Sequence, residues 1–140
     1  MHIPNKGTKR KWTKEELEAE MDGVDGKLLV DRMLEVLDYF QPQFWWIENP
    51  WLSRMRDYIV DLPYVCVDYC RYSDWGYRKR TRLWTNIPFE PRTCDGTGAR
   101  GNMQGKRHQV NLIDRGGYLL EKYRVPAALI EELLGACEQD

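Results

Sequence analysis

The chain has 140 residues, a formal net charge of −1 and 42% hydrophobic residues. This length predicts a single domain with a sizeable core, and the hydrophobic and aromatic content excludes a chain that is disordered throughout. No apolar run is long enough to span a bilayer, and the first residues lack the apolar segment of a signal peptide. We therefore expect a cytoplasmic or nuclear protein that is not secreted.

Two helices are predicted in the first third of the chain. Thr13 and Glu16 form a capping box, which predicts a short acidic helix that ends near Met21. The Asp- and Gly-rich residues 22–26 predict a turn. Apolar residues then recur at helical spacing, which predicts a helix over residues 27–40.

Residues 44–50 read Phe-Trp-Trp-Ile-Glu-Asn-Pro, and this is the most informative stretch. The short apolar run predicts a buried parallel strand over residues 44–47. Glu48 would then follow the carboxyl end of this strand, where ligands bind in open α/β sheets. The alternative is that Glu48 caps the next helix, because acids are favoured at helix N-termini.

Helix and strand patterns continue to the C-terminus. Apolar spacing predicts an amphipathic helix over residues 51–62, and two strands are expected over residues 64–70 and 80–85. Arg78, Arg80 and Arg82 would share one face of the second strand. A last helix is expected from Pro126, because proline is favoured in the first helical turn.

The order of these elements indicates an α/β fold. We expect residues 1–12 to be a basic, flexible lead-in and residues 13–140 to form one α/β domain. Residues 87–117 show little periodicity, and such a long irregular region is usually functional or mobile.

Charge is distributed unevenly along the chain. Residues 71–115 contain ten basic and four acidic side chains, which gives this block a net charge of +6. Such a block suggests a surface that faces a polyanion, for which we expect weak, salt-dependent and largely sequence-independent binding. The alternative is an ordinary solvated surface.

The four cysteines are expected to be reduced thiols, because no secretory signal is present. Cys66 and Cys70 are interpreted as packing residues on one face of a strand. Cys94 and His108 could contribute to a zinc site, but no Cys-x-x-Cys pair accompanies them. No metal site is therefore predicted.

The Glu-Asn-Pro segment resembles the Glu-Asn-Val/Pro motif of cytosine-5 DNA methyltransferases. Tyr69-Cys70-Arg71-Tyr72 and the basic segment 78–86 resemble the later part of phage- and virus-type members, and segment 123–126 resembles their C-terminal end. The similarity covers roughly residues 25–137. It implies the latter half of a Rossmann-like methyltransferase sheet with flanking helices, and DNA as a partner.

The resemblance also implies roles for individual residues. Glu48 would contact the N3 and exocyclic amine edge of a flipped-out cytosine, and Asn49 would organise the following turn. Lys79 and Thr81 are expected in the base pocket, with Arg78, Arg80 and Arg82 on phosphates. A register shifted by one residue would instead place Arg80 and Arg82 in the pocket.

Two features of the family are missing from these 140 residues. The catalytic cysteine belongs to a Pro-Cys motif before Glu48, and residues 1–65 contain no cysteine. The Gly-rich loop that binds S-adenosylmethionine is absent too, so this chain alone is not expected to bind that cofactor or to transfer methyl groups.

Three hypotheses remain open at this stage. The chain is either a catalytic-half fragment or subunit that acts only with a complementary half, or an inactive truncated homologue that serves as a DNA-binding or protein-interaction module. In the second case a homo-oligomer could cover the surface left by the missing half. The third hypothesis is an unrelated small α/β domain with a chance Glu-Asn-Pro.

Overall fold

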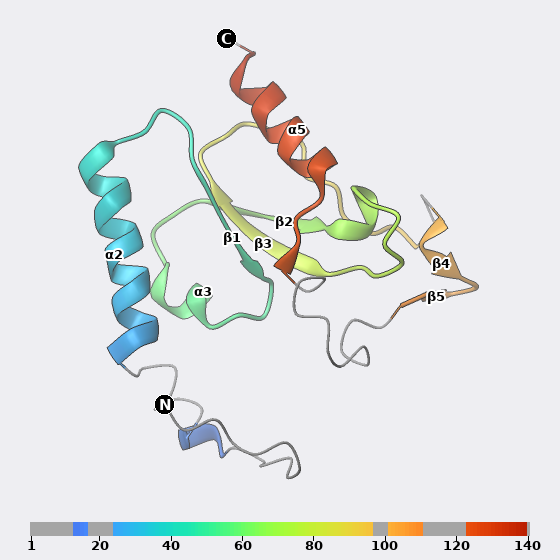
Figure 1. Ribbon diagram of the computed structural model, residues 1–140, viewed down its shortest axis with the longest axis horizontal. Helices are drawn as coiled ribbons and strands as arrows, with labels where there is room; N and C mark the ends of the chain where they lie inside the picture. The colour runs from blue at the N-terminus through green and yellow to red at the C-terminus, as the bar shows by residue number, and fades with distance from the viewer. Residues whose placement is uncertain (1–12, 17–23, 97–100, 111–122, 140) are drawn as a thin grey trace. The chain divides into compact units, whose positions relative to one another are not determined.

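The computed structural model describes residues 13–16, 24–96, 101–110 and 123–139 (Figure 1). The chain divides into two compact units, Met1–Gln41 and Pro42–Asp140. The secondary structure is mixed α/β, as predicted. The expected lead-in at residues 1–12 lies outside the described residues, and the single domain over residues 13–140 stays a prediction.

The first unit contains helix α2, Val24–Phe40. The predicted capping box before it is confirmed: Thr13 N donates to Glu16 Oε2 over 3.0 Å, and Glu16 N donates to Thr13 Oγ1 over 3.1 Å. Residues 17–21 of the predicted first helix lie outside the described residues. The predicted turn is wrong over residues 24–26, because these residues are the first of α2. Aspartate is favoured both in turns and at helix N-termini, so its presence here did not distinguish the two.

The second unit is built on a three-stranded sheet with the order β1-β3-β2 (Figure 1). Its strands are β1 (Trp46–Pro50), β2 (Tyr64–Asp68) and β3 (Arg80–Thr85). Strand β3 is antiparallel to both neighbours, so the expected parallel strand around residues 44–47 is wrong in its pairing and begins two residues too early. The expected burial is wrong too, because no residue of β1 is buried and Trp46 is 38% exposed. The short connection between β2 and β3 returns the chain in the opposite direction, which favours antiparallel pairing.

The expectation of a long helix after Pro50 is also wrong. Helix α3 spans only Met55–Tyr58, and Leu52 and Val60, which flank it, are 75% and 72% exposed. An apolar period alone does not make a helix where these side chains find no core to pack against.

Short elements complete the second unit. The predicted strand over residues 64–70 ends at Asp68 and continues as a 3₁₀ turn, η1 (Tyr69–Arg71). Within the irregular region expected at residues 87–117, strands β4 (Met103–Gln104) and β5 (Arg107–His108) form a hairpin.

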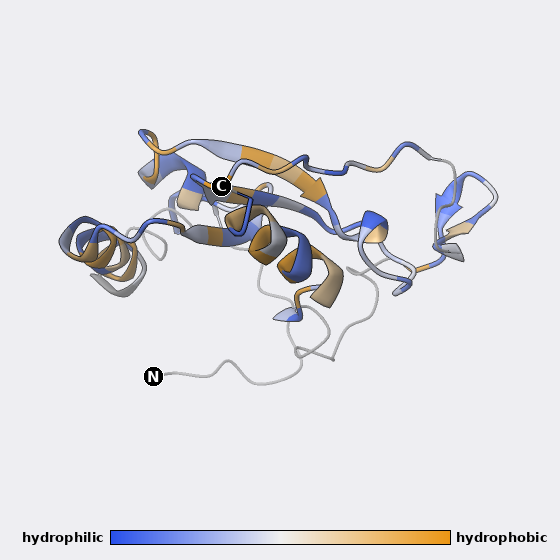
Figure 2. Cartoon of the chain, turned by 90° about the horizontal axis from the view of Figure 1, so that it is seen from above, coloured by the Kyte–Doolittle hydropathy of each residue, from blue (hydrophilic) through white to orange (hydrophobic). Residues whose placement is uncertain are grey.

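Helix α5, Ala127–Cys137, covers one face of the sheet and confirms the predicted last helix (Figure 1). The core combines helix and strand residues: Val67, Tyr69, Tyr72, Leu83, Ile87, Leu129 and Leu133. Hydrophobic colouring gathers on the sheet and on α5, whereas the β4–β5 hairpin is mostly hydrophilic (Figure 2). No helix among the described residues is long and apolar enough to cross a bilayer.

Candidate functional site

Glu48 is the third residue of β1 and pairs with Leu83 of β3. It therefore lies beside the 80–85 strand, as predicted, but within β1 and not beyond its end. Its carboxylate accepts a hydrogen bond of 2.8 Å from the Tyr69 hydroxyl and lies 3.9 Å from Lys79 Nζ. Asn49 is paired with Arg82 inside the same strand, just before the turn at residues 51–52, and its role in organising that turn stays a prediction.

Lys79 has an unusual local structure. Its backbone φ is +40°, in the left-handed region that side-chain-bearing residues rarely adopt, and only 8% of its side chain is exposed. Its ammonium lies 4.8 Å from the centre of the Tyr69 ring. Burial lowers the pKa of Lys79, and the nearby Glu48 carboxylate opposes that shift. Backbone strain of this kind clusters at functional sites.

Tyr69 is the third member of this cluster and is completely buried. Burial raises the pKa of its phenol well above the ordinary value, and the Glu48 carboxylate raises it further. The phenol therefore stays protonated and donates to Glu48 over the whole neutral range. Sequence reasoning did not assign Tyr69 to the site, although the Tyr-Cys-x-Tyr segment that carries it was part of the family resemblance.

Thr81 lies next to this cluster but is also fully buried. Its hydroxyl donates to the Lys79 carbonyl oxygen over 3.1 Å. In this structure Thr81 therefore supports the strained backbone at Lys79, and Lys79, whose side chain is only 8% exposed, is the one of the two that lines the groove described below.

Arg78 and Arg80 lie near the buried carboxylate of Asp68. Arg80 makes two hydrogen bonds of 3.0 Å to the Asp68 oxygens, and these bonds raise the pKa of its guanidinium. The Nε atom of Arg78 is 3.8 Å from Asp68, and its side chain is 49% exposed. Arg78 is thus the more available of the two for an external anion.

Arg82 is held differently from the other two arginines. Only 9% of the residue is exposed, and its guanidinium lies 4.2 Å from the ring centres of both Trp51 and Tyr64. Its Nε atom has no hydrogen-bond partner among the described residues. Stacking between two aromatic rings makes Arg82 a packing residue in this structure.

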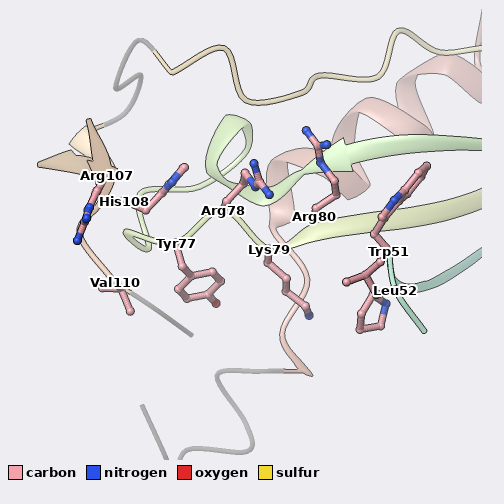
Figure 3. A pocket seen from close by; sticks show the side chains of 10 residues that line it. Trp51, Leu52, Tyr77, Arg78, Lys79, Arg80, Arg107, His108 and Val110 are labelled. Carbon is pink, nitrogen blue, oxygen red and sulfur yellow. The ribbon is translucent and has the colours of Figure 1, made fainter. Parts of the chain in front are cut away.

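These segments border an open groove with a volume of about 760 Å³ (Figure 3). Its lining contains three arginines and one lysine, the aromatic side chains of Trp51 and Tyr77, and no acidic residue. The lining residues are Pro50, Trp51, Leu52, Tyr77, Arg78, Lys79, Arg80, Arg107, His108 and Val110. Tyr77 and Lys79 point to one side of their segment, whereas Arg78 and Arg80 point to the other (Figure 3).

The groove has two walls of different origin. One wall comes from β1 and the 77–80 segment, and the other comes from the β4–β5 hairpin, which supplies Arg107 and His108 (Figure 3). Sequence reasoning placed Arg107 in the basic block but did not connect it with Lys79, because residues that far apart leave no local signal. Next to the groove, Cys70, Cys94 and His108 bring potential metal ligands together within 4.8 Å of one another.

Comparison with known proteins identifies one strong relative. The chain is 43% identical, over an alignment 148 positions long, to the probable DNA (cytosine-5)-methyltransferase of Frog virus 3, and the match covers 97% of this chain and 67% of the relative. No protein-family model and no solved structure matches the chain. Similarity at this level over nearly the whole chain excludes a chance Glu-Asn-Pro in an unrelated fold. The chain belongs to the cytosine-5 DNA methyltransferase family.

Proposed function

We propose that this chain is the base-recognition part of a cytosine-5 DNA methyltransferase, which transfers methyl from S-adenosylmethionine to cytosine only together with a complementary half. The observation that carries the proposal is the contact between Glu48 of the Glu-Asn-Pro motif and Lys79, whose side chain also lines the cationic groove. Lys79 borders a space that the aromatic rings of Trp51 and Tyr77 also line, and the Glu48 carboxylate, which is not itself part of that lining, lies 3.9 Å from the Lys79 ammonium.

A flipped-out cytosine presents groups that match this arrangement. Its exocyclic amine donates a hydrogen bond, and its carbonyl oxygen accepts one. We assign the amine and N3 edge to Glu48 and the carbonyl to Lys79, with Thr81 fixing the Lys79 backbone. Tyr69 holds the Glu48 carboxylate in place by its 2.8 Å hydrogen bond, so the acceptor is ordered before the base arrives.

Phosphate contacts are assigned to the exposed cations along the groove. Arg78 and Arg107 are the strongest candidates, because both side chains border the groove and both residues are largely exposed. Arg80 would contribute a smaller share, since Asp68 already binds its guanidinium, and Arg82 would act through its packing between two rings.

The nucleophile and the cofactor site would come from sequence outside these 140 residues. In the family mechanism a cysteine thiolate adds to C6 of the base, and none of the four cysteines here precedes Glu48. One edge of β1 pairs with β3, and no other described strand pairs with its second edge. We propose that further strands of a Rossmann-like sheet join there, since an unpaired strand edge favours addition of another strand.

A methyl-transfer assay tests this proposal. The chain would be joined to the part of the Frog virus 3 relative that lies outside the alignment, which is about one third of that protein. We expect transfer from labelled S-adenosylmethionine to cytosine-containing DNA by the joined protein, and none by the 140-residue chain alone. Turnover by the chain alone would refute the need for a complementary half.

The role of Glu48 is tested in the same active protein. Glu48→Gln should lower turnover by about 10²–10⁴-fold, the usual contribution of a positioned acid or base, while DNA affinity changes little. The matched control is Glu131→Gln on the exposed surface of α5, which should leave turnover unchanged. Equal turnover of the Glu48→Gln variant and the parent would contradict the assignment.

A second function is favoured by the groove itself. The groove lining has no acidic residue and contains the cationic side chains of Arg78, Lys79, Arg80 and Arg107. Such a lining favours binding of a polyanion even if no methyl group is transferred. If the joined protein transfers no methyl group but the chain binds DNA with a steep salt dependence, the chain acts as a DNA-binding module.

A further inference from the structure

We propose that Cys70, Cys94 and His108 form a zinc site that fastens the β4–β5 hairpin to the sheet. Cys70 belongs to η1, Cys94 to the loop that follows β3, and His108 to β5. Their ligand atoms all lie within 4.8 Å of one another. These residues are far apart in the sequence, so no short Cys-x-x-Cys motif indicates the site. Thiolate and imidazole are the ligands that zinc prefers.

The distances fit a bound zinc ion as well as they fit the direct hydrogen bond between Cys94 and His108. Zn–S and Zn–N bonds of about 2.3 and 2.0–2.1 Å in tetrahedral geometry put the sulfur and nitrogen about 3.5 Å apart. The observed distance from Cys94 Sγ to His108 Nε2 is 3.6 Å. The two distances that involve Cys70 are at most 4.8 Å, so they would have to shorten by no more than about 1.0–1.3 Å to reach zinc-site spacings of about 3.8 Å between sulfurs and about 3.5 Å between sulfur and nitrogen.

The space between these residues fits an ion better than a substrate. They border a cavity of about 10 Å³, which is close to the volume that one water molecule needs. Among the described residues, no fourth cysteine, histidine or acidic side chain joins the cluster, so a water molecule would complete the coordination. Three protein ligands and a water are typical of catalytic zinc sites. A cavity of about 10 Å³ admits no organic substrate, however, so we assign the ion a structural role.

Hydrogen bonds around the cluster hold the ligands in place. The Cys94 amide donates to Asp68 Oδ2 over 2.7 Å, and the Cys70 carbonyl accepts from Asn102 Nδ2 over 2.9 Å. Asn102 is buried and also bonds the Ser73 carbonyl and the Gly76 amide. Such partners around a metal site orient its ligands and keep the site formed.

The consequence for the groove follows from His108, which lines both the small cavity and the groove. A metal ion at this position would fix β5, and with it Arg107, relative to the wall that carries Lys79. The β4–β5 hairpin has only two residues in each strand and a mostly hydrophilic surface, so it has little apolar packing of its own (Figure 2).

Metal content of the full 140-residue chain tests the site. Protein expressed with added zinc and then passed through a chelating resin should retain about one zinc per chain by elemental analysis. Cys94→Ser and His108→Asn should lose that zinc, whereas Cys66→Ser and Cys137→Ser, which alter the two cysteines outside the cluster, should keep it. Retention of zinc in both ligand variants, or its absence from the parent protein, would overturn the proposal.

Cobalt substitution distinguishes a lost ligand from a misfolded variant. Co²⁺ bound to the parent should give the visible absorption of a tetrahedral site with a thiolate-to-cobalt charge-transfer band. His108→Cys should retain stoichiometric metal with a stronger charge-transfer band, because a third thiolate replaces the imidazole. Unchanged cobalt spectra in His108→Cys, or a disulfide between Cys70 and Cys94 found by mass spectrometry of protein purified without oxidant, would contradict the site.

Discussion

The two walls of the groove are held by different forces. The wall that carries Lys79 continues into β3, which packs against β1, β2 and α5 around completely buried residues such as Leu83 and Leu129. The wall that carries Arg107 belongs to a hairpin with only two residues in each strand, which is held by the hydrogen bonds of Asn102 and by the cluster around Cys94. The wall that carries Lys79 is therefore fixed by hydrophobic burial, whereas the wall that carries Arg107 depends on a few polar contacts.

The largest effect should come from the hydrophobic wall. Leu129→Ala removes a side chain that is 1% exposed and leaves a cavity under the sheet, so the free energy of unfolding should fall by about 2–5 kcal/mol. Urea denaturation followed by tryptophan fluorescence measures this change. Leu134→Ala on the same helix is the control, because that residue is 50% exposed. Equal losses in the two variants would show that α5 does not stabilise the sheet through this face.

Asn102→Ala should affect the polar wall selectively. It leaves the Cys70 carbonyl, the Ser73 carbonyl and the Gly76 amide without their partner, at a local cost of about 1–3 kcal/mol. Hydrogen exchange should therefore accelerate at the Gln109 and Val110 amides, which bond Asn102 O and Gly76 O.

Amides within β3 should keep their protection in the Asn102→Ala variant. Gln104→Ala is the matched control, since that exposed side chain lies on the same hairpin. Loss of protection in β3 as well would mean that the two walls unfold together, and the comparison between them would fail.

The salt dependence of DNA binding compares arginines within one segment. Arg78→Ala should reduce the slope of log affinity against log salt by about one unit if that side chain contacts a phosphate. Arg82→Ala should leave the slope unchanged and lower stability instead, because its guanidinium is stacked between Trp51 and Tyr64. Fluorescence titrations across a salt series measure both slopes, and a reduced slope for Arg82→Ala would contradict its assignment as a packing residue.

Sequence reasoning anticipated the secondary structure best where one local pattern decides it. The strand over residues 80–85, the capping box at Thr13 and the last helix are all confirmed. Strand pairing was wrong, because an apolar run such as residues 44–47 signals burial but not the direction of its neighbour.

The site was anticipated only in part, for a related reason. Glu48 and Lys79 were expected near one another through the family resemblance, and the structure brings them together. Cys94 and His108 were considered together as zinc ligands, but Cys70 was not added to them, because β2 was expected to include Cys70 as a strand residue facing the same way as Cys66. Side chains brought together by a turn and a distant hairpin leave no periodic signal in the sequence.

The smallest effect concerns the proton on Tyr69. Its pKa is raised by burial and by Glu48, so the folded protein keeps this proton at a pH where an unfolded tyrosine, with a pKa of about 10, has lost it. The stability that Tyr69 contributes is therefore complete below pH 10 and declines as the pH rises from there towards the folded pKa. Relative to Tyr69→Phe, the parent should lose free energy of unfolding above pH 10.

Absorbance at alkaline pH separates this buried phenol from exposed ones. Below the pH of unfolding, Tyr69→Phe should leave the amplitude of tyrosine ionisation unchanged, since Tyr69 does not titrate in the folded protein. If Tyr69→Phe lowers that amplitude by the contribution of one tyrosine, the Tyr69 phenol ionises in the folded state, and its surroundings are more open to water than its burial indicates.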